Sequence, residues 1–351
     1  MANIMLTDVC NLNCPYCFAN EFVNHDKNEI SQAAFDAALD FIVGDGTHRT
    51  VGLIGGEPTL HRNFEGFVRQ LIADRRVERI MLYTNGLVLD RYWDVLLHPK
   101  VQMLVNLNPP SVMGDARYGS ILKNLDHLVL DCMRPDRVTL GINMYGAQFE
   151  YSYIIEELKR YSMDHVRVSI VVPNLDEGRN IDAHAYFASM KPRLLEFFHN
   201  LLDEGIVPNF DCNKIPTCMV APQELAGFRR HLDNPVLKGK ISLSNINNAQ
   251  VVCRPVIDIR QDLTAVRCFG LSQYTKQHIG DFKGIHELEM FYMRTIDAYA
   301  YNTVYSAACV DCHRRKVAEC SGGCYGFKIN EILALQALAD KRLARMGEQA
   351  S

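Results

Sequence analysis

The chain has 351 residues, enough for one large domain or for two domains with cores of their own. Its 48% hydrophobic and 22% charged residues are ordinary for a globular protein, and a net charge of −4 without a long basic stripe excludes a nucleic-acid-binding footprint. No apolar run approaches a membrane span and no signal peptide precedes the first strand, so we expect a cytoplasmic protein with no nucleic-acid or membrane partner.

Short apolar runs alternate with amphipathic stretches from the N-terminus to about residue 205. Ser31 has the side chain of a helix N-cap. Repeated β-then-α units predict an α/β fold whose parallel sheet curls into a partial (β/α)6 barrel. The expected strands are 4–7, 51–54, 79–83, 102–107, 138–144 and 166–172, and the main expected helices are 31–43, 64–73, 118–130, 151–161 and 181–204.

The character of the chain changes after this point. Residues 206–327 hold eight of the twelve cysteines, at irregular spacing and with few periodic apolar runs. We expect this segment to depend on bound metal for part of its stability. The sequence therefore predicts a barrel over 1–205, a cysteine-rich extension over 206–327 and a C-terminal helix over 328–351.

Twelve cysteines without a secretion signal indicate metal ligands or catalytic groups rather than disulfides. Cys132 stands alone at an expected helix end and is interpreted as a small buried hydrophobe. Cys10, Cys14 and Cys17 share one short loop after the first strand, with C-x3-C-x2-C spacing. Three such thiolates suit three corners of a four-iron cluster and leave one iron open, although a zinc knuckle or buried thiols would also fit this spacing alone.

This motif, with the aromatic Tyr16 before its third cysteine, resembles the signature of the radical S-adenosylmethionine (radical SAM) enzymes. The resemblance implies that Cys10, Cys14 and Cys17 hold the catalytic 4Fe-4S cluster and that its open iron chelates SAM. It further implies reductive cleavage of SAM to methionine and a 5′-deoxyadenosyl radical, which abstracts a hydrogen atom from the substrate.

Further candidates follow later strands, whose carboxyl ends meet at one mouth of such a barrel. The Gly55-Gly56-Glu57-Pro58 turn resembles the family motif that holds the amino group of SAM, although a tight βα turn would use the same glycines. Thr84-Asn85-Gly86 resembles another family turn, and for single asparagines a satisfied barrel polar group is an equal alternative. The expected SAM-binding residues are Tyr16, Gly55, Gly56, Glu57, Pro58, Thr84, Asn85, Asn106 and Asn143, with Asn108 a neighbour of the same kind.

The C-terminal cysteines form three groups, Cys212-x5-Cys218, Cys253-x14-Cys268 and Cys309-x2-Cys312-x7-Cys320-x3-Cys324. The last group alone would suit a four-thiolate zinc site. Beside the N-terminal motif, the region resembles the SPASM extension, which implies one or two auxiliary 4Fe-4S clusters. By position, Cys253, Cys268 and Cys324 would ligate the first, with Cys218 or Cys212 as the fourth ligand, and Cys309, Cys312 and Cys320 would begin the second.

Two departures from the SPASM pattern leave the second cluster incomplete. The third gap is seven residues rather than five, and no cysteine follows Cys324. Cys212, Asp311 or His313 would have to complete it, unless that cluster is open or absent.

The resemblance favours a maturase that cross-links, oxidises or epimerises a ribosomally made peptide. Phe269 stands where sulfatase-maturing relatives carry a catalytic aspartate, which disfavours formylglycine formation. The barrel is expected to begin near residue 1, so leader recognition would need a separate leader-binding protein. The basic run 313–316 suits a flavodoxin- or ferredoxin-type electron donor, or is a solvated loop.

Two other functions stay open. The same radical chemistry could act on a small molecule, as a dehydrogenase or decarboxylase in cofactor or natural-product biosynthesis. A non-catalytic zinc or iron–sulfur protein is the alternative from a different class.

Overall fold

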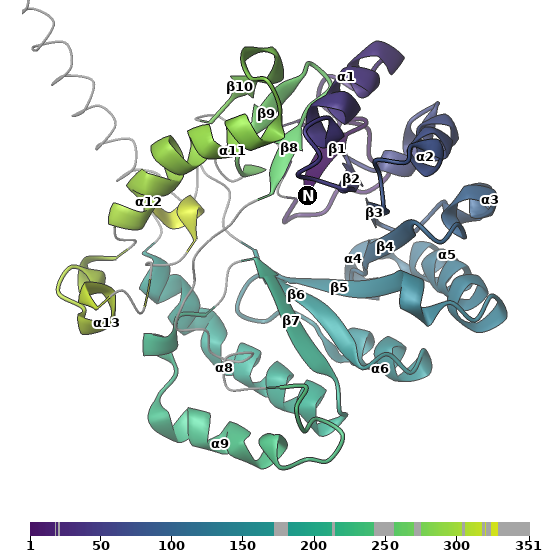
Figure 1. Cartoon of the computed structure of the whole chain (residues 1–351). Helices are drawn as coiled ribbons and strands as arrows, with labels where there is room; N and C mark the ends of the chain where they lie inside the picture. The colour runs from purple at the N-terminus through teal and green to yellow at the C-terminus, as the bar shows by residue number, and fades with distance from the viewer. Residues whose placement is uncertain are drawn as a thin grey trace, which may run out of the picture.

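Ten strands form one sheet in the order β10-β9-β8-β1-β2-β3-β4-β5-β6-β7 (Figure 1). The structure is a computed structural model that describes residues 1–17, 19, 22–171, 182–212, 215–241, 256–269, 275–303, 306–317, 320 and 324–328. All neighbours from β8 to β7 pair in parallel, whereas β9 and β10 add an antiparallel edge. The strands are β1 (Ala2–Met5), β2 (Thr50–Ile54), β3 (Arg79–Thr84), β4 (Val101–Asn106), β5 (Val138–Met144), β6 (His165–Ile170), β7 (Val207–Cys212), β8 (Ile257–Ile259), β9 (Thr264–Val266) and β10 (Gln277–His278).

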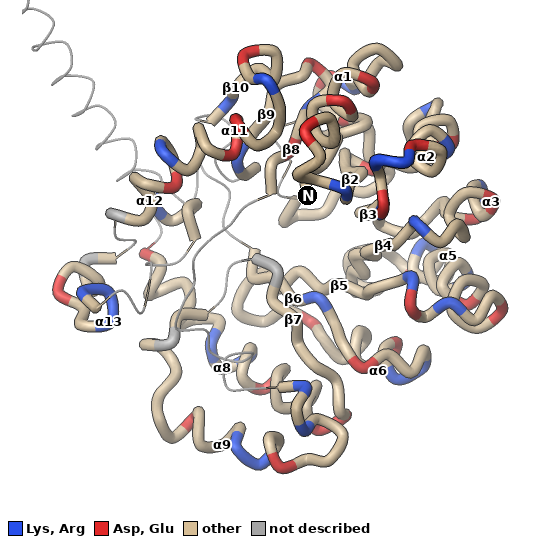
Figure 2. Tube along the Cα trace, viewed as in Figure 1, with Lys and Arg blue, Asp and Glu red and all other residues tan. Residues whose placement is uncertain are grey.

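Helices surround the outer face of the curled sheet (Figure 1). Figure 2 shows that Lys, Arg, Asp and Glu gather on these helices and on loops, while the strands carry few charges. The α-helices are α1 (Gln32–Val43), α2 (Phe64–Ala73), α3 (Trp93–Leu96), α4 (Pro110–Met113), α5 (Asp115–Leu125), α6 (Ser152–Arg160), α8 (Ala183–Asp203), α9 (Pro222–Leu232), α11 (Ile285–Tyr292), α12 (Ala298–Asn302) and α13 (His313–Lys316). None of the helices in the described part of the chain has the length and apolarity that crossing a membrane requires.

The predicted α/β fold with a largely parallel sheet is confirmed, and so are most of its elements. Ser31 caps α1, its Oγ accepting a hydrogen bond from the Ala34 N–H at 3.1 Å. The helix expected over 118–130 begins earlier, at Asp115, and changes to a π-helix over Asp126–Asp131. Cys132 is the C-cap of that π-helix and is half-buried.

The sheet extends beyond the six predicted strands on both sides. β7 lies beside β6, and β8 lies on the other side of β1, so the sheet includes strands from beyond residue 205. Apolar alternation over three residues is too short a signal to reveal β8 or β9 in the sequence. The division into domains stays a prediction, and the predicted C-terminal helix lies outside the described residues beyond Lys328.

The main core fills the space between the outer face of the sheet and the helices. The rings of Phe35 from α1 and Phe67 from α2 stack within it, with centroids 4.0 Å apart. A smaller apolar cluster, which includes Met5, Ile54 and Val266, occupies the opposite, inner face. The inner face therefore has an apolar wall of its own.

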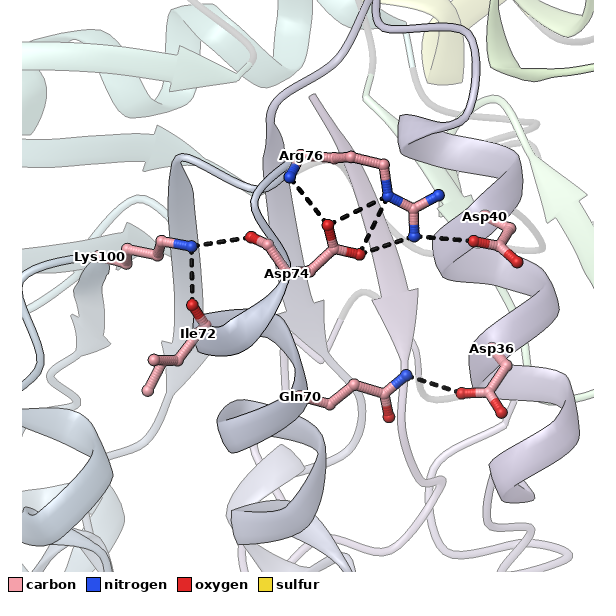
Figure 3. A network of polar contacts seen from close by, with 7 residues as sticks. All are labelled: Asp36, Asp40, Gln70, Ile72, Asp74, Arg76 and Lys100. Carbon is pink, nitrogen blue, oxygen red and sulfur yellow. Dashed lines mark hydrogen bonds and ion pairs between the residues drawn. The ribbon is translucent and has the colours of Figure 1, made fainter.

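Polar contacts tie α1 and α2 together on the outside of the barrel (Figure 3). Arg76, just after α2, donates hydrogen bonds to Asp74 and, at 2.8 Å, to Asp40 of α1. The ammonium of Lys100, just before β4, donates to the last carbonyls of α2 at Ile72 and Asp74, both at 2.8 Å. The two bonds from Lys100 satisfy carbonyls that the end of a helix otherwise leaves unpaired.

The inner face also carries a buried carboxyl group. Asn3 Nδ2 of β1 donates to Asp258 Oδ1 of β8 at 2.7 Å, while Asn3 Oδ1 has no hydrogen-bond partner. Burial raises the pKa of Asp258 from its usual 3.8 to about 7. A protonated Asp258 would satisfy Asn3 Oδ1 by donating to it.

We expect Asp258→Asn to stabilise the fold in a pH-dependent way. The folded protein holds this proton between pH 4 and 7 whereas the unfolded chain loses it, so this group's contribution to stability falls as pH rises through that window. The amide cannot ionise, so the variant should gain about 2–4 kcal/mol over the wild type at pH 8 and almost nothing at pH 4. Urea unfolding at both pH values measures this, and an equal difference at both would contradict a raised pKa.

Candidate active site

The cysteine loop leaves β1 at the carboxyl edge of the sheet and is held by the chain that returns from it. The Cys10 N–H donates to Asn24 Oδ1 at 2.8 Å, and the Asn24 N–H donates to the Asp8 carbonyl at 2.8 Å. Asn24 has a φ of +62°, a left-handed conformation that asparagine adopts more readily than most residues. These bonds fix the start of the loop on both sides of Cys10.

The thiols of Cys10, Cys14 and Cys17 are all half-buried and free of disulfides. The Leu12 N–H donates to Cys10 Sγ at 3.4 Å, and Asn108 Nδ2 donates to Cys14 Sγ at 3.2 Å. The Tyr16 hydroxyl donates to Asn108 Oδ1. Asn108 thus links the tyrosine to a cysteine of the motif, a pairing that no spacing in the sequence reveals.

Burial, with smaller contributions from the nearby Glu57, Cys14 and Cys17, raises the pKa of Cys10 to about 11. Thiols in such a group become thiolates only when a positive centre compensates their charge. The donor set is purely thiol, which fits an iron–sulfur cluster. Among the described residues, no three Cys, His, Asp or Glu side chains are arranged to hold a single metal ion.

The Gly55-Gly56 turn after β2 packs directly on the cysteine loop. The Gly56 N–H donates to the Thr7 carbonyl at 2.7 Å, and the Glu57 N–H donates to the Val9 carbonyl at 2.8 Å. A Cβ on Gly55 would lie 2.6 Å from the Thr7 oxygen, and one on Gly56 would lie 2.4 Å from the Val9 oxygen. Besides the expected close approach of a ligand, the lack of a side chain at Gly55 and Gly56 allows the backbone of the cysteine loop to pack against this turn.

Glu57 is buried, with 1% of its surface exposed. Its Oε1 accepts from the Thr59 N–H and from the hydroxyls of Thr59 and Thr84, at 2.6–3.2 Å, and its Oε2 accepts from the Asn85 N–H at 2.7 Å. These donors are all uncharged, and burial raises the pKa of the carboxyl group. Each oxygen of a carboxylate accepts about two hydrogen bonds. Oε2 accepts one from Asn85 and can therefore accept one more.

Thr84 and Asn85, at the end of β3, connect this turn to the cysteine loop. Asn85 Nδ2 donates to Asn11 Oδ1 at 2.7 Å. Gly86 follows with a φ of +80°, and Asn124 Nδ2 donates to its carbonyl at 2.8 Å. The three turns after β1, β2 and β3 therefore form one hydrogen-bonded unit. Pro58, expected beside Glu57, begins the short 3-10 helix Pro58–Leu60 and is buried.

Asn106 and Asn143 lie near the carboxyl ends of β4 and β5. Asn106 Oδ1 is buried without a hydrogen-bond partner, and it would lie 3.1 Å from a Cβ on Gly141 of the neighbouring strand. Asn143 Oδ1 accepts a hydrogen bond from Arg167 at 2.6 Å. An orphaned buried acceptor is the kind of atom that a bound ligand satisfies, so Asn106 is the stronger candidate of the two.

The C-terminal cysteines lie on several different elements of the chain. Cys212 ends β7, Cys218 is exposed in a 3-10 helix (Thr217–Met219), and Cys268 is half-buried shortly after β9. Cys309 and Cys324 are buried, whereas Cys312 and Cys320 are half-buried. Cys253 lies outside the described residues, so the predicted first auxiliary cluster is described only in part.

Replacing Gly56 with alanine should disturb the cysteine loop, because the new Cβ would strike the Val9 backbone rather than a movable side chain. We expect a cost of about 1–3 kcal/mol at the loop and a severalfold loss of the iron that depends on Cys10, Cys14 and Cys17. We obtain that iron as the difference in iron content between each protein and the same protein with all three cysteines replaced by alanine.

Gly119→Ala is the matched control for Gly56→Ala, since nothing lies within 4 Å of its Cβ position in α5. Equal iron in the two variants would mean that the packing of the turns is not needed for the cluster.

A family model described as the radical SAM superfamily matches residues 4–113. The GTP 3′,8-cyclase of Staphylococcus epidermidis is 34% identical over 267 residues, which cover 68% of this chain and 70% of that protein. Matches to three other curated relatives span between 18% and 52% of those proteins' own lengths.

Two solved structures share the fold at low sequence identity. A structure titled native anSMEcpe with bound AdoMet and Cp18Cys peptide has a TM-score of 0.58 at 15% identity, covering 99% of both chains. Streptococcus suis SuiB bound to S-adenosylmethionine has a TM-score of 0.58 at 14% identity, covering 93% of this chain and 73% of that one. With the cysteine loop, the Gly55-Gly56-Glu57 turn and a matched relative across two thirds of the sequence, the chain belongs to the radical SAM superfamily.

Proposed function

We propose that this protein is a radical SAM enzyme that modifies a peptide. Cys10, Cys14 and Cys17 would hold a 4Fe-4S cluster, and SAM would bind its open iron. When bound, the cluster and SAM supply a 5′-deoxyadenosyl radical that abstracts hydrogen from the substrate. The observation that carries the proposal is the single hydrogen-bonded unit of three turns, which joins the thiols to a buried, uncompensated carboxylate.

Glu57 is suited to the ammonium group of SAM. Its carboxylate is buried among uncharged donors, and the free acceptor position on Oε2 would receive one N–H. The Thr84 and Asn85 donors fix the orientation of the carboxylate, so little reorganisation is needed on binding. Asn106 Oδ1 offers a second buried acceptor for a hydroxyl or amino donor of the ligand.

The inner face has the apolar surroundings that a reactive radical needs. Cys17 packs against the cluster of Met5, Ile54, Val266 and Phe269. Such a wall excludes water from one side of the site. Phe269 contributes apolar surface there, with only 7% of its surface exposed.

The radical chemistry is tested by Cys14→Ala. Anaerobically reconstituted protein, given SAM and a strong reductant, should release 5′-deoxyadenosine, and the variant should release none, because two thiolates cannot retain the site-differentiated cluster. Cys132→Ala is the matched control, since that cysteine lies on the outside of the barrel beside His127. Equal yields from the Cys14 variant and the wild type would overturn the proposal.

A peptide substrate is supported by the similarity of the whole chain to a structure that contains a bound peptide. The match to anSMEcpe extends over both chains almost completely, and that structure's title names a bound peptide. The further cysteines of residues 212–324 suit one or two auxiliary clusters, which would receive the electron left by a net oxidation of the peptide. A flavodoxin- or ferredoxin-type donor and a separate leader-binding protein belong to this proposal, as does a reducing cytoplasmic location.

The second candidate function is radical chemistry on a small molecule. It is favoured by the sequence relatives, several of which are named GTP 3′,8-cyclase. A nucleotide would present phosphates that need cationic partners, and Arg167 is a cationic side chain near the mouth, donating to Asn143.

Mass spectrometry distinguishes the two candidates. Co-expression with short neighbouring open reading frames should give a peptide that has lost two hydrogens, for a cross-link or dehydrogenation, or that has gained deuterium from heavy water, for an epimerisation. The matched control is the Cys14→Ala protein with the same peptides. Unchanged peptides together with consumption of GTP or another metabolite would replace the peptide proposal with the small-molecule one.

A further inference from the structure

A second group of thiols gathers where two distant segments meet at the start of α8. Ser306 Oγ donates to Asp182 Oδ2, at the N-cap of α8, at 3.4 Å, and Cys309 Sγ lies 3.9 Å from His184 Nε2 in its first turn. The 3-10 helix that carries Cys218 also contacts α8. That helix follows β7, which runs back from the end of α8 toward its start, so both segments reach the same end of α8.

Four thiols come together there. The thiol of Cys218 interacts electrostatically with those of Cys320 and Cys312, and the thiol of Cys309 interacts with all three. The Cys312 N–H also donates to the Cys309 carbonyl at 3.3 Å, which sets the turn between them.

We propose that Cys218, Cys309, Cys312 and Cys320 together ligate one iron–sulfur cluster, with Cys218 as the fourth ligand. The cluster would join the segment before α9 to the segment after α12. This assignment changes the expectation from spacing, in which Cys218 was a candidate for the other auxiliary cluster. Cys253, Cys268 and Cys324 remain for that cluster.

The other candidates for the fourth ligand are less suitable. The Asp311 side chain is 91% exposed and pairs with Lys316 at 3.1 Å, on the outer side of its turn. His313 is exposed at the start of α13. Cys218 is exposed too, but it lies among the other three thiols.

Local charge also suits a cluster with four thiolates. Arg314 lies close enough to the Cys218 thiol, and Arg315 to the Cys309 thiol, to interact with it electrostatically. Both belong to α13, which Figure 2 shows as a basic stretch. Such positive charge stabilises an anionic cluster and raises its reduction potential.

The test uses the full chain with Cys10, Cys14 and Cys17 replaced by alanine, so that only C-terminal iron is counted. Adding Cys218→Ala should remove about four irons per chain, or change the electron paramagnetic resonance signal of the reduced cluster if an open site forms. Cys132→Ala and Asp311→Ala in the same background should change neither. Unchanged iron and an unchanged signal after Cys218→Ala would overturn the assignment.

A second measurement needs no variant and so is independent of any folding defect. Cys218 is exposed, so iodoacetamide should alkylate it readily in the metal-free wild-type chain. Reconstitution with iron and sulfide should reduce that labelling at least tenfold, while Cys132 is labelled equally in both forms. Equal labelling of Cys218 in both forms, or one zinc per chain in place of iron, would overturn the proposal.

The inference rests on the proposed iron–sulfur chemistry but not on the substrate. Its readouts are bound iron, the resonance signal and thiol protection, and none of these measurements requires SAM or a peptide. Failure of the peptide proposal would leave these results unchanged, and failure of this assignment would leave 5′-deoxyadenosine release by the N-terminal site unchanged.

Discussion

The close approach of the Gly55-Gly56 backbone to residues 7–9 is the contact on which the site depends. Two hydrogen bonds, from Gly56 N to the Thr7 carbonyl and from Glu57 N to the Val9 carbonyl, cross this contact at 2.7 and 2.8 Å. They extend the pairing of β1 with β2 past the end of the sheet and into two loops. Ordering this loop costs conformational entropy, and the two hydrogen bonds to its neighbour offset part of that cost.

This contact also explains why a carboxylate is buried beside the cysteines. Glu57 follows the glycines directly, so the backbone that holds the loop also directs the side chain inward. Four uncharged donors from residues 59, 84 and 85 offset part of the cost of desolvating it. The carboxyl group of Asp258, lower on the inner face, has one donor from Asn3, and burial raises its pKa to about 7. The two buried acids in this barrel thus differ in how many donors offset the cost of burying them.

The C-terminal half of the chain depends on the barrel for its own organisation. β8 pairs with β1, and α8 presents its first turn to the segment that carries Cys309. Short elements such as α13 and the 3-10 helix Thr217–Met219 have too few residues to be stable alone. The 3-10 helix contacts α8, and the thiols that gather there would add metal bonds to that packing.

The sequence by itself determined the repeating strand and helix units, the N-cap at Ser31 and the α2 boundaries, because periodicity and capping are local properties. It also identified the cysteine motif and the turn that contains Glu57, since both are continuous in the chain. The pairing of Asn108 with Cys14, the orphaned Asn106 oxygen and the pairing of β8 with β1 came only from the tertiary structure. The same is true of Cys218, which lies about 90 residues before the thiols that surround it. Contacts between residues so far apart are set by how helices and strands pack, and no spacing along the chain encodes them.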